Sequence, residues 1–174
     1  MAKYAVTPTG RERRFGENEI IVSKTDLKGR IIYANDVFLK IADFTEKEAL
    51  NQPHSIVRHP DMPRSVFKLL WDTLEQKREI FAYVKNMAKN GDHYWVFAHV
   101  TPSLNEAGEI IGYHSNRRAP YASALEKVEP LYAQLLETES APQNARQGLA
   151  AGEALLKRTI EDTGMSYEEF VFTL

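Results

Sequence analysis

The sequence predicts an α+β fold: a five-stranded antiparallel sheet with helices on one face, followed by a C-terminal helical extension. Short segments rich in β-branched and aromatic residues occur twice before a central helical region and three times after it. Turn-forming residues that include glycine separate neighbouring segments within each group, as expected for hairpins. Hairpins on either side of a group of helices are typical of a sheet that carries its helices on one face.

The first hairpin joins strands at residues 20–22 and 31–33 through a glycine turn. Asn35 comes just before an apolar helical stretch and is a suitable N-cap. Thr45 and Glu48 form the T-x-x-E pattern of a capping box, which predicts a second short helix. The first half of the domain is therefore a hairpin followed by short helices.

Three prolines make the next connection, residues 52–63, irregular. Pro63 suits the first turn of a helix. The apolar residues that follow recur with helical spacing and predict an amphipathic helix to about residue 76: Val66, Leu69, Leu70 and Leu74.

The last three strands are predicted at residues 80–87, 94–101 and 110–115. The turn Asn90-Gly91-Asp92 between the first two is a strong hairpin signal. A further turn at residues 105–108 separates the second strand from the third. These segments complete the predicted sheet.

A change in composition after Pro120 towards Ala, Leu and Glu predicts the helical extension. A helix is expected at residues 121–139, kinked or restarted at Pro130, and another at 148–163 after a break. Ser166 and Glu169 form a second capping-box pattern.

The chain of 174 residues is long enough for one domain with an extension. We divide it into an N-terminal arm at residues 1–18, a sensory domain at 19–119 and the helical extension at 120–174. The arm is polar and basic, and we expect it to be loosely packed, with a short helix at its end.

Composition excludes several functions. The 22 Lys and Arg residues balance 24 Asp and Glu residues, which argues against nucleic acid as a partner. The absence of cysteine excludes disulfides and Cys-ligated metal centres. We see neither an apolar stretch of about 18 residues nor a secretory signal, so we expect a soluble cytoplasmic protein without membrane insertion.

Polar side chains that could bind a ligand concentrate in the proline-stiffened connection. His54, Arg58, His59 and Asp61 lie within eight residues of one another. Prolines reduce the entropy lost when such a loop is fixed, and the guanidinium fork suits a pyrophosphate or a carboxylate. The structural alternative is that Arg58 and Asp61 pair with each other and cap the next helix.

The sequence gives little support for catalysis or for a metal site. Its five histidines include no H-E-x-x-H pair, although a haem would need only one axial imidazole. We find no G-x-S-x-G nucleophile motif and no Gly-rich phosphate loop. We therefore expect neither an enzyme nor a metal centre.

Aromatic residues concentrate in the last strands. They form either an aromatic ladder in the sheet core or a flat wall on which a planar cofactor stacks: Phe81, Tyr83, Tyr94, Trp95 and Phe97.

Residues from about 19 to 118 resemble a PAS domain, in particular the FAD-binding sensory domain of bacterial aerotaxis receptors. The segments that carry the resemblance are Tyr-Ala-Asn-Asp-Val-Phe at 33–38, Gln-Pro-His at 52–54, Arg-His-Pro-Asp-Met-Pro at 58–63, Val-Lys-Asn at 84–86 and Lys-Asn-Gly-Asp-His-Tyr-Trp-Val at 89–96. The Arg-His-Pro-Asp-Met-Pro segment is the most specific of these.

The resemblance implies a non-covalent FAD between the sheet and the helices. Arg58 would neutralise its pyrophosphate, His54 or His59 would pack or hydrogen-bond against it, and Asp61 would orient Arg58 or accept from the ribose. The amide of Asn86 could meet the polar edge of the ring. Three further residues are candidate contacts: Asn35, Phe81 and Trp95. Phe81 would stack where the family often has the tryptophan of Gly-x-Pro-Trp.

The implied function is that of a stand-alone sensor of redox or oxygen state, as in energy taxis. It would signal to a partner protein through the sheet face or the C-terminal helices, and a homodimer is possible. Two alternatives stay open: a gas sensor with haem bound through His54 or His59, and a PAS module without a cofactor that only binds proteins.

Overall fold

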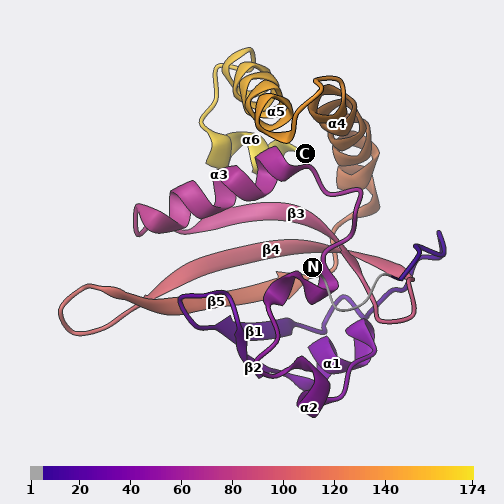
Figure 1. Cartoon of the computed structure of the whole chain (residues 1–174), viewed down its shortest axis with the longest axis vertical. Helices are drawn as coiled ribbons and strands as arrows, with labels where there is room; N and C mark the ends of the chain where they lie inside the picture. The colour runs from indigo at the N-terminus through magenta and orange to yellow at the C-terminus, as the bar shows by residue number, and fades with distance from the viewer. Residues whose placement is uncertain (1–5) are drawn as a thin grey trace.

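The computed structural model describes residues 6–174 and contains a five-stranded antiparallel sheet in the order β2-β1-β5-β4-β3 (Figure 1). This confirms the predicted fold class. The strands are β1 (Ile21–Thr25), β2 (Ile31–Ala34), β3 (Ile80–Met87), β4 (His93–Leu104) and β5 (Ile110–Arg118).

The hairpin of β4 and β5 is longer than the sequence predicts. Both strands run past the expected ends, to Leu104 and Arg118. The proline at position 102 does not stop β4, because beyond Val100 this strand pairs with β5 and no longer with β3. One edge of β4 is free there, and proline is tolerated at such an edge.

Three predicted helices lie between the hairpins: α1 (Asp36–Ala42), α2 (Glu46–Ala49) and α3 (Arg64–Glu75). The connection that was predicted to be irregular also contains a short 3-10 helix, η1 (His54–Val57). The side chain of Asn35 accepts from the Phe38 amide, so it is the N-cap of α1. The capping box of Thr45 and Glu48 is present at α2. α1 packs on β1, and α3 packs on β3 and β4.

The C-terminal extension forms α4 (Ala122–Ser140), α5 (Ala145–Glu161) and α6 (Tyr167–Thr173). α4 continues through Pro130 as one helix, so the helix does not restart there, and the alternative expectation of a kink stays a prediction. Pro130 lies on the exposed side of α4, where water can satisfy the carbonyl that loses its intrahelical bond. α5 packs against both α4 and α3, whereas α6 packs on β3.

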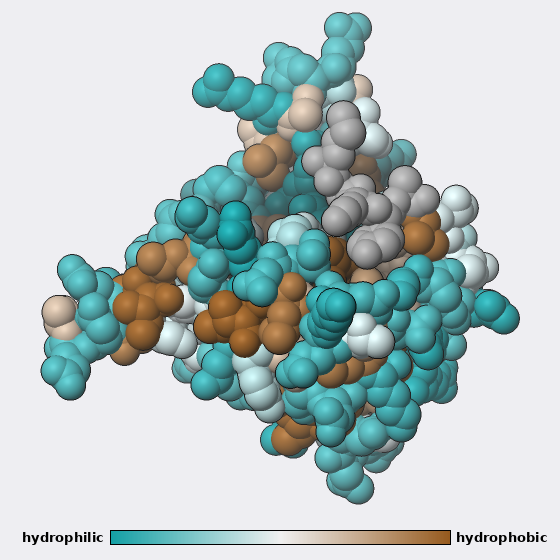
Figure 2. All heavy atoms as spheres, turned by 60° about the horizontal axis from the view of Figure 1, so that its bottom comes forward, coloured by the Kyte–Doolittle hydropathy of each residue, from teal (hydrophilic) through white to brown (hydrophobic). Residues whose placement is uncertain are grey.

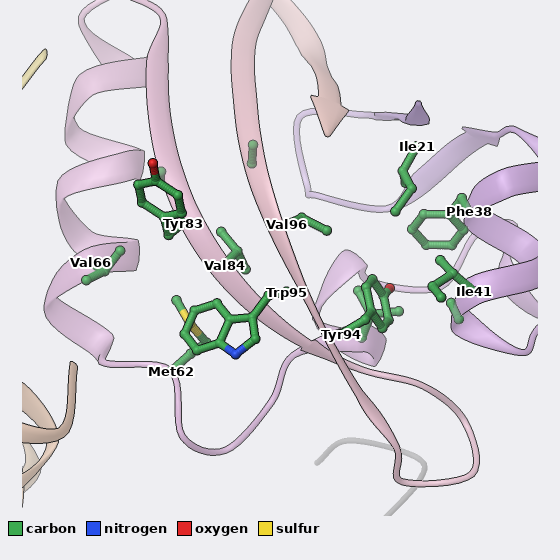
Figure 3. Packing of buried hydrophobic residues seen from close by; sticks show 14 of the residues in the cluster. Ile21, Phe38, Ile41, Met62, Val66, Tyr83, Val84, Tyr94, Trp95 and Val96 are labelled. Atoms are coloured by element: carbon green, nitrogen blue, oxygen red, sulfur yellow. The ribbon is translucent and has the colours of Figure 1, made fainter. Parts of the chain in front are cut away.

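The two faces of the sheet are covered by different helices. Phe38 and Ile41 of α1 join Ile21 and Val96 in the core on the face covered by α1 to α3 (Figure 3). The alternating residues of β3 and β4 point to the opposite face. There Tyr132 of α4 packs on Trp95 at 6.0 Å between ring centroids, and Phe172 of α6 packs on Phe81 at 4.8 Å.

The same helices also close the edge of the sheet. The Tyr132 hydroxyl donates to the Tyr83 carbonyl at 2.6 Å, and the Tyr167 hydroxyl donates to the Phe81 carbonyl at 2.7 Å. These carbonyls lie on β3, the edge strand. The contacts satisfy groups that an open edge would offer to another chain.

The described part of the N-terminal arm is extended and contains no helix over residues 6–18, unlike the prediction. It lies along the β3–β4 turn. His93 donates its amide to the Arg11 carbonyl, and the Arg13 amide donates to the His93 carbonyl. Gly91 has φ +93° and lies against Thr7, so a side chain at position 91 would collide with the arm. Residues 1–5 of the predicted arm lie outside the described residues.

Candidate functional site

A cavity of about 530 Å³ lies between the sheet and the helical segments η1 and α3. Its apolar walls come from the face of β3 and β4 turned towards α3 and from α3 itself: Val84, Ala98, Val100, Phe67, Leu70, Trp71 and Leu74. Leu149 of α5 also reaches the cavity. An apolar cavity with a few polar groups is the usual form of a small-molecule site.

Arg117 organises the polar end of this cavity. Its Nη2 donates to Ser23 Oγ at 2.7 Å and lies 2.8 Å from His54 Nε2. His54 Nε2 is also 3.1 Å from Ser23 Oγ. Burial and the nearby positive charge of Arg117 lower the pKa of His54 to about 3, so its imidazole is neutral. Burial also lowers the pKa of Arg117, to about 10.

Three lining residues each carry a buried polar atom with no hydrogen-bond partner within residues 6–174: Thr25 Oγ1, Ser115 Oγ and Arg117 Nη1. They lie on the adjacent strands β1 and β5, where Thr25 is opposite Tyr113 and Ser23 is opposite Ser115. Buried polar groups are nearly always satisfied, so three unused ones at one cavity favour a polar ligand there.

The charged residues that line the cavity are all basic, and two of them, Arg64 and Lys68, are each paired with a carboxylate, Glu139 and Asp72. Lys28, Arg58, Arg64, Lys68 and Arg117 line the cavity, and none of its lining residues in the described part of the chain is Asp or Glu. Lys28 and Arg58 are exposed, so these charges lie at the mouth, whereas Arg117 is buried. This arrangement suits an anionic ligand.

Arg58 and Asn86 are predicted site residues that the structure brings together. Arg58 lies over the Phe67 ring, with its guanidinium carbon 4.3 Å from the ring centroid. Although Arg58 is exposed as a whole residue, partial burial of its guanidinium lowers its pKa. The backbones of Arg58 and Asn86 form an isolated β-bridge. Asn86 is buried and lines the cavity. With His54, these are the predicted residues that line it.

His59 and Asp61 lie outside the cavity. The His59 ring is buried against His93, 5.9 Å between centroids, and its Nδ1 accepts from the Asp61 amide at 3.1 Å. Asp61 is exposed and pairs with Lys85 at 3.2 Å. The alternative pairing of Arg58 with Asp61 is not among the ion pairs of residues 6–174, where Asp61 pairs with Lys85.

The other candidates have structural positions. Phe81 and Trp95 lie on the sheet face opposite the cavity, under Phe172 and Tyr132. Asn35 caps α1 and also accepts from the Val22 amide. These contacts explain the three residues by packing and capping.

The polar residues of β1 and β5 that line the cavity were not predicted from the sequence. Ser23 and Thr25, like Ser115 and Arg117, alternate along a strand and so share one face. Polar residues at alternate positions of central strands were the available signal, because such strands normally place apolar side chains on a covered face.

No group of three or more His, Cys, Asp or Glu side chains within residues 6–174 could hold a metal ion. Within the same range, no helix is both long and apolar enough to cross a bilayer.

Comparisons with known proteins agree with this fold. The PAS fold family matches residues 31–117. The aerotaxis receptor of Escherichia coli K12 is 41% identical over 127 residues, which are 73% of this chain and 25% of the receptor. The nitrogen fixation regulatory protein of Klebsiella pneumoniae is 30% identical over 99 residues, 57% of this chain and 20% of that protein. The chain thus spans a quarter or less of these relatives.

Solved structures show the same fold at low identity. The dark structure of the blue-light photoreceptor Aureochrome1 LOV has a TM-score of 0.57 and 18% identity, over 67% of this chain and 86% of that one. The PAS domain of a protein from Colwellia psychrerythraea has a TM-score of 0.54 and 19% identity, over 58% and 86%. A structure titled for a flavin analogue in a light-oxygen-voltage domain has a TM-score of 0.56 and 15% identity, over 66% and 86%.

Proposed function

The chain belongs to the PAS fold family, and from that premise we propose that its cavity binds a flavin, FAD, whose redox state the protein signals to a partner. The protein would act in the cytoplasm as a sensor of redox or oxygen state in energy taxis, and not as an enzyme. The similarity to the aerotaxis receptor supports the choice of signal.

The cavity itself carries the proposal. An isoalloxazine ring has an apolar part, a polar edge and, in FAD, a pyrophosphate attached through a chain. The apolar walls suit the ring, and the unused polar atoms of Thr25, Ser115 and Arg117 suit its polar edge. Arg58 and Lys28, exposed at the mouth, suit the phosphates.

The flavin would supply reversible electron transfer, and the residues of the chain would respond to it. Arg117 holds a positive charge at the inner end of the cavity, which favours negative charge on a bound ring. Its Nη2 hydrogen bonds link β1, β5 and η1 through Ser23 and His54. A change in charge beside Arg117 therefore biases the packing of three elements between two states.

The signal would leave through a surface that contacts a partner. The C-terminal helices and the free part of the sheet face are the proposed surfaces, and a second copy of the chain is one possible partner. The β4–β5 hairpin projects from the body and exposes apolar side chains (Figure 2), including Leu104 and Ile111. Such exposed apolar groups are common where proteins interact.

The haem alternative has less structural support. A haem needs an imidazole nitrogen free to bind iron. His54 Nε2 already contacts Arg117 and Ser23, and His59 is outside the cavity. The alternative of a PAS module that binds only proteins is an outcome of the experiment below.

The first experiment is a visible absorption spectrum of the chain purified without added cofactor, followed by FAD titration. The bands of an oxidised flavin, lost on reduction, would support the proposal, and a Soret band would replace it with haem.

Ala98→Leu should abolish flavin binding by filling the cavity, because Ala98 lines it. Thr101→Leu, on the opposite face of β4, is the matched control. A colourless protein that does not bind FAD would contradict the proposal.

A further inference from the structure

Glu139 is a buried carboxylate near the end of α4, and its contacts lie on another helix. Its Oε1 accepts from the Ser65 amide at 2.8 Å and from the Ser65 hydroxyl at 2.7 Å. Its Oε2 accepts from the Arg64 amide at 2.9 Å and from Arg64 Nε at 3.1 Å. Its side chain is 4% exposed, so water does not replace these contacts.

These contacts cap α3 from outside. The residue before α3 is Pro63, which makes no side-chain cap. The first amides of a helix need acceptors, and its N-terminus favours negative charge. Glu139 supplies both to Arg64 and Ser65. Burial raises the pKa of Glu139, but the hydrogen bonds from Ser65 and Arg64 outweigh it and lower the pKa, so the group stays ionised.

α5 is shaped to fit the same carboxylate. Gly148 and Gly152 lie one turn apart on α5 and are buried against Glu139. A Cβ at Gly152 would lie 2.7 Å from Glu139 Cγ, and one at Gly148 would collide with the Glu139 carbonyl oxygen. Arg64 also donates to the Ala145 carbonyl at 2.9 Å. The junction of α4 and α5 is therefore fixed on the first turn of α3.

That turn opens onto the cavity. Arg64 lines the cavity, as do residues further along α3, and Leu149 of α5 lines it beside them. Arg58, at the mouth, lies within the electrostatic field of both Glu139 and Arg64. A movement of α3 therefore changes both the cavity wall and the hydrogen bonds that Glu139 accepts from Arg64 and Ser65.

We propose that Glu139 is a positioning residue that couples docking of the α4–α5 helical pair to occupancy of the cavity, through the first turn of α3. This rests on the proposed function, because the occupant is taken to be FAD. A ligand that orders α3 makes docking of α4–α5 more favourable. Docked helices hold Arg64 and Leu149 in the wall and strengthen ligand binding by the same factor.

The test combines FAD titration with hydrogen–deuterium exchange of the full chain, with and without FAD. In the unaltered chain, FAD should slow exchange in α5. In Glu139→Ala, α5 should lose this response and the affinity for FAD should fall at least about fivefold. Glu137→Gln removes an exposed carboxylate from the same helix and is the matched control.

The outcomes distinguish a failure of the Glu139 coupling from a failure of FAD binding. If Glu139→Ala keeps both the FAD-dependent protection of α5 and the affinity of the unaltered chain, the coupling is wrong. If that variant does not fold, Glu139→Gln and Ser65→Ala replace it, because each removes only part of the contact. A chain that binds FAD without any response in α5 contradicts the coupling alone. A chain that binds no FAD overturns both proposals.

Discussion

Replacing Arg117 with methionine should weaken FAD binding without destabilising the empty protein. The substitution keeps a long unbranched side chain but removes a positive charge that is 4% exposed. It also removes Nη1, which has no partner within the described residues and which we assign to the ligand. Replacing a residue needed only for folding would instead destabilise the empty protein and leave the affinity of the folded protein for FAD unchanged.

The magnitudes follow from the contacts of Arg117. Burial lowers its pKa to about 10 from an ordinary 12.5. At about 1.4 kcal/mol per pKa unit, keeping it charged costs the empty protein roughly 3 kcal/mol. The two contacts of Nη2, with Ser23 and His54, return about 1.5 kcal/mol each. The effects cancel, so the free energy of unfolding should change by less than about 1 kcal/mol.

The loss of FAD affinity is not offset in this way, because methionine cannot replace the hydrogen bond that Arg117 Nη1 would donate to the ligand. A hydrogen bond from a charged donor contributes about 1.5–3 kcal/mol, which is roughly a 10- to 100-fold loss of FAD affinity. Urea unfolding of the empty protein and fluorescence titration with FAD measure the two quantities. Arg118→Met is the control, since Arg118 is exposed and points to the opposite face of β5. Unchanged FAD affinity in Arg117→Met would refute the assignment of the polar end of the cavity.

Three further predictions concern single side chains. Arg58→Ala should lower FAD affinity about tenfold and leave folding intact, as seen in the flavin-to-protein absorbance ratio after purification; full flavin content would contradict its role at the phosphates. Tyr132→Phe leaves the Tyr83 carbonyl without its hydroxyl donor and should cost about 1–3 kcal/mol in urea unfolding, whereas Tyr121→Phe, at an exposed position, should cost nothing measurable. The pKa of His54 is about 3 in the folded protein against 6.5 ordinarily, so the unfolded chain takes up the proton first. Stability should therefore fall by up to about 1.4 kcal/mol per pH unit as pH drops from 6.5 towards 3, and an equally steep fall in His54→Asn would exclude His54 as the cause.

The sheet and its short helices were predictable because their signals are local. Glycine turns, the N-cap at Asn35 and the capping boxes at Thr45 and Ser166 act within a few residues of the chain, and all three caps are present. The course of α4 through Pro130 was not predictable in the same way. It depends on which side of the helix faces water, and that is decided by distant packing.

The cavity was only half predictable for a related reason. Arg58 and Asn86 lie in segments that resemble a known family, and both line the cavity. The segment of Arg58 also contains His59 and Asp61, which do not line the cavity. Ser115 was missed because strand alternation shows which residues share a face but not which face a helix will cover.

Buried polar atoms without a hydrogen-bond partner lower the stability of the folded protein. Five buried side-chain polar atoms lack a partner within residues 6–174, and three of them line the cavity; the other two belong to Tyr94 and Trp95. Other backbone groups that lack a partner within their own helix or strand are hydrogen-bonded. Glu139 accepts from the Arg64 amide at the start of α3, and the Tyr132 hydroxyl donates to the Tyr83 carbonyl on β3. The clustering of three unpartnered atoms at one cavity points to a bound molecule that completes those groups. Since α3 borders the cavity and is capped by Glu139, and Leu149 of α5 itself lines the cavity, such a molecule can influence the C-terminal helices directly.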